Sequence, residues 1–235
     1  MSQNFFRFPH TPHLAWLGPG QPRDDKVLSP DEALAFLDGE IVVEEKIDGA
    51  NLGISLDADG RLRAQNRGSW LVPPFAGQFS RLLVWLDAHQ DRLFDALDTH
   101  LIAFGEWCAA RHSLDYDRLP DWWIVFDVYD RRAQRFFSTA RRDTWARQAG
   151  LSVVPQRARG RFSLDDLRTL LENETSHYRQ GALEGFVLRR EDDTWLHTRA
   201  KLVRAQFVQA IDSHWRQRGL QWNRLNTEHA GRIAG

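Results

Sequence analysis

The chain has 235 residues, 42% hydrophobic and 27% charged, a composition typical of one folded soluble domain and not of a disordered or fibrous chain. Its formal net charge of -1 excludes an overall positive field, so any site for a polyanion must be a local cluster of basic side chains. A single cysteine, Cys108, excludes an internal disulfide and a multi-cysteine metal site. No stretch of 18 apolar residues and no signal-peptide pattern is found, so we predict a cytoplasmic protein without a membrane partner.

The first third of the chain predicts a loop, one helix and several short strands. The segment FPHTPHLAWLGPGQP, residues 8–22, is rich in proline and glycine and favours an extended conformation. Ser29 is a suitable N-cap and Pro30 suits the first helical position, so SPDEALAFLD predicts a helix. Apolar and β-branched residues then predict a meander of three strands, with Lys46 at or near a strand end, at 40–48, 50–57 and 61–68.

Three later segments predict helices. Residues 77–97 have apolar side chains at helical spacing, continuing into a second short helix. The segment FSTARRDTWARQAG predicts another helix, with Ser138 or Thr139 as its N-cap. In SLDDLRTLL, Ser163 and Asp166 form a capping box at the start of a third.

Four apolar stretches between and after these helices predict strands, and a helix followed by an irregular tail is expected at 205–226. The strands are expected at 101–107, 122–130, 183–192 and 194–203. This mixture of strand clusters and helices indicates an α+β domain.

Lysine is scarce in this chain. Of the 31 lysine and arginine residues, 28 are arginines and only three are lysines: Lys26, Lys46 and Lys201. Arginine stays protonated at any workable pH, whereas a desolvated lysine amine can lose its proton and become a nucleophile. Chance retention is the simpler explanation for an isolated lysine. Lys46 is followed by Asp48 and Gly49, and the weight of this K-x-D-G motif depends on what accompanies it.

Six short motifs follow one another along the chain: EKIDGAN, NRG, FGEW, VFDVYD, LEGFVLRR and RAKLVR. In order and approximate spacing they resemble the motifs of the covalent nucleotidyltransferases, which comprise ATP-dependent RNA and DNA ligases and mRNA capping enzymes. The resemblance is strongest to the small ATP-dependent RNA ligases of the phage type and their bacterial relatives, and it covers about residues 40 to 205.

The resemblance implies an α+β covalent nucleotidyltransferase fold, ATP-grasp-like as in DNA ligases and mRNA capping enzymes, with antiparallel sheets flanked by helices. Only 34 residues follow Lys201, too few for an OB-fold, so none is expected. We therefore expect residues 1–235 to form a single nucleotidyltransferase domain, in which 206–235 are a short C-terminal helical tail.

The resemblance also implies a three-step reaction with ATP as cofactor and Mg²⁺, or Mn²⁺, as the metal ion. A lysine attacks the α-phosphate of ATP, AMP passes from the lysine to an RNA 5'-phosphate, and a 3'-hydroxyl displaces AMP. Each step places negative charge around phosphorus, so such a site needs cations and positioned donors more than acid or base groups.

In this resemblance Lys46 corresponds to the nucleophile, and neighbouring cations, including metal and Lys201, are expected to lower the pKa of its amine. Asp48 is expected to orient the lysine or metal-bound water, and Gly49 to let the backbone approach the nucleotide. Glu45 matches a position beside the adenine, and Asn51 matches one that contacts phosphate or metal-bound water.

Four further residues match positions in the later motifs. Arg67 corresponds to an arginine that holds phosphate and then the RNA 5'-phosphate, a task suited to a bidentate guanidinium. Glu106 matches the carboxylate that accepts hydrogen bonds from the ribose hydroxyls, and Phe126 the aromatic that stacks on the purine. Glu184 matches a carboxylate that binds the catalytic metal or its waters, as a hard oxygen ligand suits magnesium.

The last motif departs from the family, since many relatives have lysine where this chain has Arg199. Arg199 can still bind phosphate, but it cannot replace a lysine that acts as a proton donor. Lys201 retains that role, and the phosphate partners of the two residues stay open.

Taken singly, the same residues have structural interpretations. Glu106 and Glu184 could be solvated strand residues, Phe126 a core residue, and Arg67 a turn arginine. Cys108 has no histidine partner in a recognisable pattern, so we predict a buried small hydrophobe. His112 is expected to be structural or on the surface.

The function expected from the sequence is an ATP-dependent RNA ligase that joins RNA 5'-phosphate and 3'-hydroxyl ends through a lysyl-AMP, in RNA repair. A separate end-healing polynucleotide kinase or phosphatase is the expected protein partner, because the chain has no GxxxxGK[ST] loop, and we expect a monomer. The tail, including His214, Trp215 and Arg216, is expected to pack on the domain or to help bind RNA. The alternatives are a minimal DNA ligase that seals nicks, or a nucleotide- or RNA-end-binding module that has lost turnover.

Overall fold

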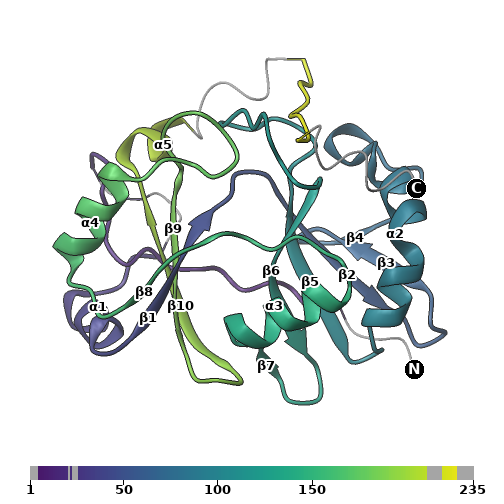
Figure 1. Ribbon diagram of the computed structural model, residues 1–235, viewed down its shortest axis with the longest axis horizontal. Coiled ribbons are helices and arrows are strands. Elements are labelled where there is room, and N and C mark those ends of the chain that lie inside the picture. Colours follow the sequence, from purple (N-terminus) through teal and green to yellow (C-terminus); the bar gives the residue numbers. More distant parts are fainter. Residues whose placement is uncertain (1–4, 21, 23–25, 211–218, 227–235) are drawn as a thin grey trace.

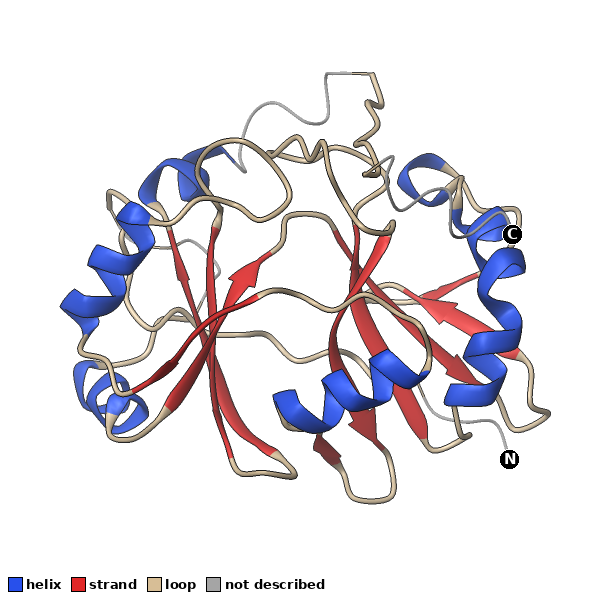
Figure 2. Ribbon diagram, in the orientation of Figure 1, coloured by secondary structure: helices blue, strands red, loops and turns tan. Residues whose placement is uncertain are grey.

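The computed structural model describes residues 5–20, 22, 26–210 and 219–226, whose strands form two antiparallel sheets side by side (Figures 1 and 2). The first sheet has the order β10–β9–β1–β8, and the second the order β4–β3–β2–β5–β6–β7. Strands of the first sheet are β1 (Ile41–Lys46), β8 (Gln156–Gly160), β9 (Gly185–Glu191) and β10 (Leu196–Val203). Those of the second are β2 (Ala50–Leu56), β3 (Leu62–Gln65), β4 (Trp70–Leu71), β5 (Leu101–Trp107), β6 (Trp123–Asp130) and β7 (Arg135–Phe136).

Helices cover the outer face of each sheet and leave the inner faces turned toward each other. Apolar side chains of α1 (Pro30–Leu37) and α4 (Leu164–Asn173) pack against the first sheet. Those of α2 (Leu82–Ala96) and α3 (Thr139–Gln148) pack against the second. A short 3₁₀ helix (Gly77–Phe79) precedes α2, and α5 (Ala205–Ala210) follows β10. The alternation of β10 illustrates the division, because Ala200 and Leu202 are buried in the outer core while Lys201 lies at the inner face.

Local sequence signals predicted these elements correctly where they are strong. The helix α1 begins at Pro30 after the N-cap Ser29, and α3 begins after Ser138. The predicted capping box of α4 is present, with Ser163 accepting from the Asp166 amide and the Asp166 carboxylate accepting from the Ser163 amide. The described residues from 5 to 22 form no helix, as the prolines predict, and bend at 14–15 and 18–20.

The predicted meander is wrong in one respect. β2, β3 and β4 are consecutive neighbours, but β1 belongs to the other sheet and pairs with β8 and β9. The error arises because a short turn and a crossover between sheets have similar sequences. The strands β4, β7 and β8 were not predicted. β4 and β7 have only two residues each, and β8, QRARG, is mostly polar.

Two helical predictions also need correction. The second short helix expected at the end of 77–97 does not exist, because α2 continues without a break to Ala96. In the tail, residues 219–226 are not helical but run along the loop after β5, with bridges from Trp222 to Ala110 and from Leu225 to Leu119. His214, Trp215 and Arg216 lie outside the described residues. None of the helices in the described ranges has the length and apolarity needed to cross a bilayer.

Candidate active site

Lys46 is the last residue of β1, where the chain crosses from the first sheet to the second. Residues 47–49 make the crossing, and β2 begins at Ala50. The Lys46 Nζ donates a hydrogen bond to Glu184 Oε2 at 2.7 Å, and Glu184 directly precedes β9, the neighbour of β1. A side chain at Gly49 would place its Cβ 2.7 Å from the Trp107 carbonyl oxygen. The glycine of the K-x-D-G motif is therefore required by the close approach of the crossing to β5.

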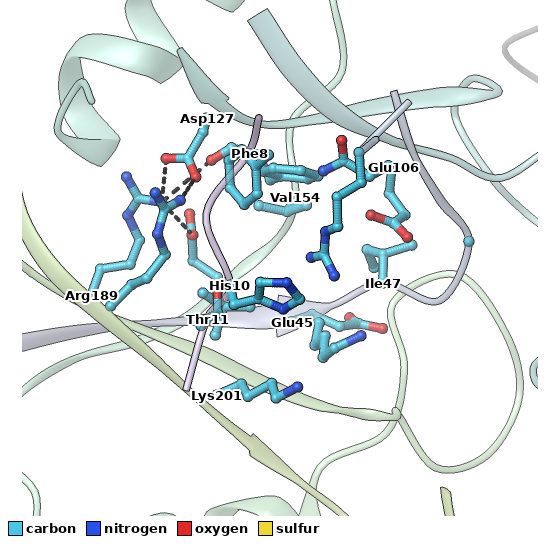
Figure 3. A pocket seen from close by; sticks show the side chains of 18 residues that line it. Phe8, His10, Thr11, Glu45, Ile47, Glu106, Asp127, Val154, Arg189 and Lys201 are labelled. Carbon is cyan, nitrogen blue, oxygen red and sulfur yellow. Dashed lines mark hydrogen bonds and ion pairs between the residues drawn. The ribbon is translucent and has the colours of Figure 1, made fainter. Parts of the chain in front are cut away.

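A pocket of about 370 Å³ lies between the two sheets, beside Lys46 (Figure 3). It receives side chains from strands far apart in the sequence. Nine of the eleven predicted site residues line it: Glu45, Lys46, Gly49, Asn51, Arg67, Glu106, Phe126, Arg199 and Lys201. The structure therefore brings together most of the set that was assembled from separate motifs.

Asp48 and Glu184 are the two predicted residues that do not line this pocket. Asp48 points to the loop after β5, where its Oδ2 accepts hydrogen bonds from the backbone amides of Ser113 and Leu114, both at 2.7 Å. Its own amide donates to the Tyr116 hydroxyl at 2.8 Å. The Asp48 Oδ2 thus anchors the loop to the crossing, and the predicted role of Asp48 toward the lysine or metal-bound water stays a prediction. Glu184 reaches the site through Lys46.

Glu45 is buried, and its carboxylate is committed to another loop. Its Oε1 accepts from the Ser176 hydroxyl at 2.6 Å and its Oε2 from the His177 amide at 2.9 Å. Burial raises the pKa of Glu45 in spite of these two hydrogen bonds. Glu45 thus fixes the loop that borders the pocket. This is the residue predicted to lie beside adenine, and both of its carboxylate oxygens already accept hydrogen bonds from the protein.

Acidic side chains surround the Lys46 amine and raise its pKa. Burial alone would lower the pKa of Lys46, but the carboxylates of Glu184, Glu106 and Asp48 outweigh it and hold the pKa above its usual value. Burial in turn raises the pKa of Glu106 to about 8 and that of Glu184 to about 7, although Lys46 opposes both shifts. The nearest charged neighbours of Lys46 among the described side chains are thus acids, and a lowering of its pKa by Lys201 together with a metal ion stays a prediction.

The arginines of the site fall into two groups. Arg199 pairs with Asp127, and its guanidinium lies 4.6 Å from the centroid of the Phe8 ring. Arg189 pairs with the same carboxylate, at 2.9 Å. Arg67, by contrast, is exposed in the loop after β3 and makes no hydrogen bond or ion pair within the described ranges. Arg67 is thus available to an anion, while the predicted phosphate contact of Arg199 would compete with Asp127.

Phe126 and Glu106 lie on neighbouring strands of the second sheet, β6 and β5. Phe126 is half-buried and packs edge-on against Phe8, with ring centroids 5.2 Å apart. Glu106 lies directly opposite Asn51 of β2. The pocket therefore has an apolar part near Phe126 and a polar part near Lys46, a combination suited to a base attached to a charged group.

Sequence reasoning missed one wall of the pocket, the N-terminal strap (residues 5–14). Phe8, His10 and Thr11 line the pocket. The strap is held to the second sheet by a hydrogen bond from Gln65 to the Phe6 carbonyl, and to the first sheet by two backbone hydrogen bonds with Lys201. The prolines indicated extended backbone, but no local signal indicated that it spans both sheets.

Two residues considered from the sequence have structural roles. Cys108 is fully buried, with its thiol 3.5 Å from the Glu106 carbonyl oxygen, and burial raises its pKa. This confirms the predicted small hydrophobe. His112 makes a hydrogen bond with Gln78 at 2.7 Å and does not line the pocket.

A comparison with protein families agrees with this geometry. The family model described as RNA ligase matches residues 39–203, which is 165 of the 235 residues and includes every strand of both sheets. The chain belongs to the RNA ligase family. Comparison with curated protein sequences finds no match.

Solved structures of RNA ligases share the fold. A Naegleria gruberi RNA ligase, solved as a lysine-to-alanine variant with ATP and Mn, has a TM-score of 0.65 at 14% identity, covering 88% of this chain and 59% of that one. A glutamate-to-alanine variant with AMP and Mn has a TM-score of 0.62 at 14% identity, with the same coverage. An archaeal ATP-dependent RNA ligase has a TM-score of 0.59 at 20% identity, covering 86% of this chain and 49% of that one. This RNA ligase chain thus spans about half to three fifths of their length, and the predicted nucleotidyltransferase-type fold is confirmed.

Proposed function

We propose that this chain is an ATP-dependent RNA ligase that joins 5'-phosphate and 3'-hydroxyl ends through a lysyl-AMP on Lys46. The observation that carries the proposal is the position of Lys46 at the pocket between the sheets, with Lys201 and Arg67 in the same lining. Membership of the RNA ligase family supports the reaction, and the neighbours solved with ATP and with AMP support the choice of nucleotide.

The side chains suit the steps of adenylyl transfer. The Lys46 amine attacks the α-phosphorus, the new N–P bond replaces the bond to pyrophosphate, and Lys201 and Arg67 offset the negative charge of the phosphates. Phe126 offers a face to the purine, and Glu106 accepts from the ribose hydroxyls. Lys46 must first lose the proton that Glu184, Glu106 and Asp48 stabilise.

A divalent metal fits the donors present. In the described ranges no group of three His, Cys, Asp or Glu side chains could hold an ion alone, so a metal would share its ligands with nucleotide phosphates, as Mg²⁺ usually does. We propose Glu184 as the protein ligand for Mg²⁺, or Mn²⁺. A bound ion would neutralise phosphate charge and compete with the Lys46 ammonium for the Glu184 carboxylate.

Adenylylation tests the proposal directly. Protein stripped of ATP and incubated with α-labelled ATP and magnesium is expected to gain covalent AMP. Lys46→Ala and Lys46→Arg are expected to gain none, the second because a guanidinium keeps its proton although it can still pair with Glu184. Lys26→Ala removes an exposed lysine away from the pocket and should label normally. Absence of label on the unaltered protein with either magnesium or manganese would rule the function out.

We further propose a role in RNA repair, in the cytoplasm, as a monomer beside a separate end-healing kinase or phosphatase. The sequence resemblance to bacterial repair ligases supports this role. Sealing assays with 5'-phosphate and 5'-hydroxyl RNA ends, and with nicked DNA, test it. Sealing of nicked DNA in preference to RNA would favour the DNA ligase alternative.

A further inference from the structure

β4 is the edge strand of the second sheet, and β3 lies next to it (Figure 1). The inner face of these two strands extends from the pocket toward that edge. Leu62 and Ala64 pack into the outer core, so the alternate residues Arg63 and Gln65 face the other way. The hydrogen bond from Gln65 to the strap identifies that other side as the inner face. Arg67 continues the row into the pocket lining.

An aromatic group accompanies these arginines. Trp70 of β4 lies directly opposite Gln65, and therefore shares the inner face. The Arg63 guanidinium carbon is 4.0 Å from the centroid of the Trp70 ring, and Phe5 of the strap packs edge-on against the same ring at 5.4 Å. The half-buried tryptophan is thus fixed in place, with a guanidinium plane stacked on it.

The charge of this face is less compensated than that of the deeper arginines. Arg189 and Arg199 are both paired with Asp127. Within the described part of the chain, Arg63 and Arg67 form no ion pair, although Arg63 helps to lower the pKa of Asp57 and Arg67 opposes the raised pKa of Glu106, so each has a carboxylate in its surroundings. Arg63 is also one cause, after burial, of the lowered pKa of Arg131 at the end of β6, which reflects two like charges held near each other.

We propose that this inner face of β3 and β4 binds the RNA strand that carries the 5'-phosphate. Arg67 is at the pocket end, in the turn after β3, and Arg63 with Trp70 lies beside it on the inner face of β3 and β4, so the face offers contacts to more than one nucleotide. Guanidinium groups bind the phosphates, and an unpaired base stacks on the Trp70 ring or the Arg63 plane, a recognition typical of single-stranded RNA. The choice of RNA rests on the proposed function.

The test is equilibrium binding of a 3'-labelled, 5'-phosphorylated 12-nucleotide RNA to the full chain, at several salt concentrations. Arg63→Gln and Trp70→Ala are each expected to weaken binding about tenfold, and Arg63→Gln to reduce the salt dependence by about one unit of slope. Arg92→Gln on α2 is the matched control, because Arg92 is an exposed arginine of the helix on the opposite face of the same sheet. It is expected to stay within twofold of the unaltered protein.

Trp70→Phe keeps a ring at the same place and is expected to retain affinity within about threefold, which separates loss of stacking from loss of folding. The proposed RNA-binding face would be overturned if Arg63→Gln and Trp70→Ala both kept an RNA affinity within twofold of the unaltered protein. An equal loss of affinity in the control Arg92→Gln would also overturn it. Binding requires no turnover of ATP. Failure of the unaltered protein to form lysyl-AMP would therefore contradict the proposed function, while unchanged RNA affinity contradicts the surface alone.

Discussion

At the scale of single residues, the chemistry of Lys46 depends on how three carboxyl groups share a poorly solvated space with one amine. Glu184 contacts the amine at 2.7 Å, and Glu106 approaches from β5 of the other sheet. The identities of these residues were predictable from the motifs. Their mutual effect was not, because a pKa depends on distances and burial that arise only when the two sheets meet.

Glu106→Gln tests this electrostatic coupling. The pKa of Glu106 is about 8 in the folded protein, whereas the ordinary pKa of a glutamate is 4.5. The protonated side chain therefore contributes its full stability below pH 4.5, and this contribution is lost progressively as the pH rises to about 8. The glutamine variant lacks that loss. We expect its free energy of unfolding, relative to that of the unaltered protein, to increase by about 3–4 kcal/mol between pH 5 and pH 8. Urea denaturation at several pH values measures it, and a pH-independent difference would contradict the assignment.

At the scale of elements, two close contacts decide where catalytic residues lie. Gly185 opens β9 directly after Glu184, and a Cβ on it would lie against the Leu202 carbonyl oxygen and 2.9 Å from Val203 Cα. The pairing of β9 with β10 can therefore be this close only with glycine at that position. The sequence shows the glycine within the motif, but only the register of β9 against β10 shows which residues it faces.

Gly185→Ala is expected to lower the free energy of unfolding by about 2 kcal/mol, since backbone atoms must move to admit the methyl group. It should also reduce adenylylation, because the displaced start of β9 carries Glu184. Gly68→Ala is the control, as its nearest neighbour is 3.9 Å away and its φ is not positive. Chemical denaturation of both variants measures the difference, and equal stabilities would refute the close contact.

The N-terminal strap is the second element whose role only the fold reveals. Phe8 is 4% exposed and packs against Phe104, Phe126 and Phe136 on the inner face of the second sheet. Phe8→Ala is expected to cost about 3 kcal/mol of unfolding free energy and to raise the KM for ATP, because it removes part of the pocket wall. Phe94→Ala, a residue 44% exposed on α2, is the control and should change neither quantity appreciably. An unaltered KM in folded Phe8→Ala would argue against the strap as a pocket wall.

At the scale of the whole molecule, a buried ionic network joins the two sheets along one wall of the pocket. Arg189 of β9 is 1% exposed and contacts Asp127 of β6 at 2.9 Å and Glu44 of β1 at 3.6 Å. Glu44 also contacts Arg142 of α3 at 2.6 Å. The network therefore fixes how the first sheet sits against β6 and α3, and hence the width of the pocket.

Arg189→Met is expected to destabilise the protein by about 3–5 kcal/mol at pH 7, because it leaves the buried carboxylates of Asp127 and Glu44 with one arginine partner each instead of two. Arg168→Ala removes an arginine whose side chain is 45% exposed and paired with Asp165, and should change stability by less than about 0.5 kcal/mol. Thermal and urea unfolding compare the two, and a small effect of Arg189→Met would show that the network is dispensable.

The sequence by itself determined the helices with strong caps, the apolar strands and the family, because these depend on local residue patterns and on ordered motifs. Nine of the eleven site residues predicted from the motifs line the pocket. Only the tertiary structure decided that β1 and β2 lie in different sheets, that Asp48 faces the loop after β5, and that the strap closes the pocket. Each of these depends on contacts between segments far apart in the chain, and such contacts leave no periodic signal in the sequence.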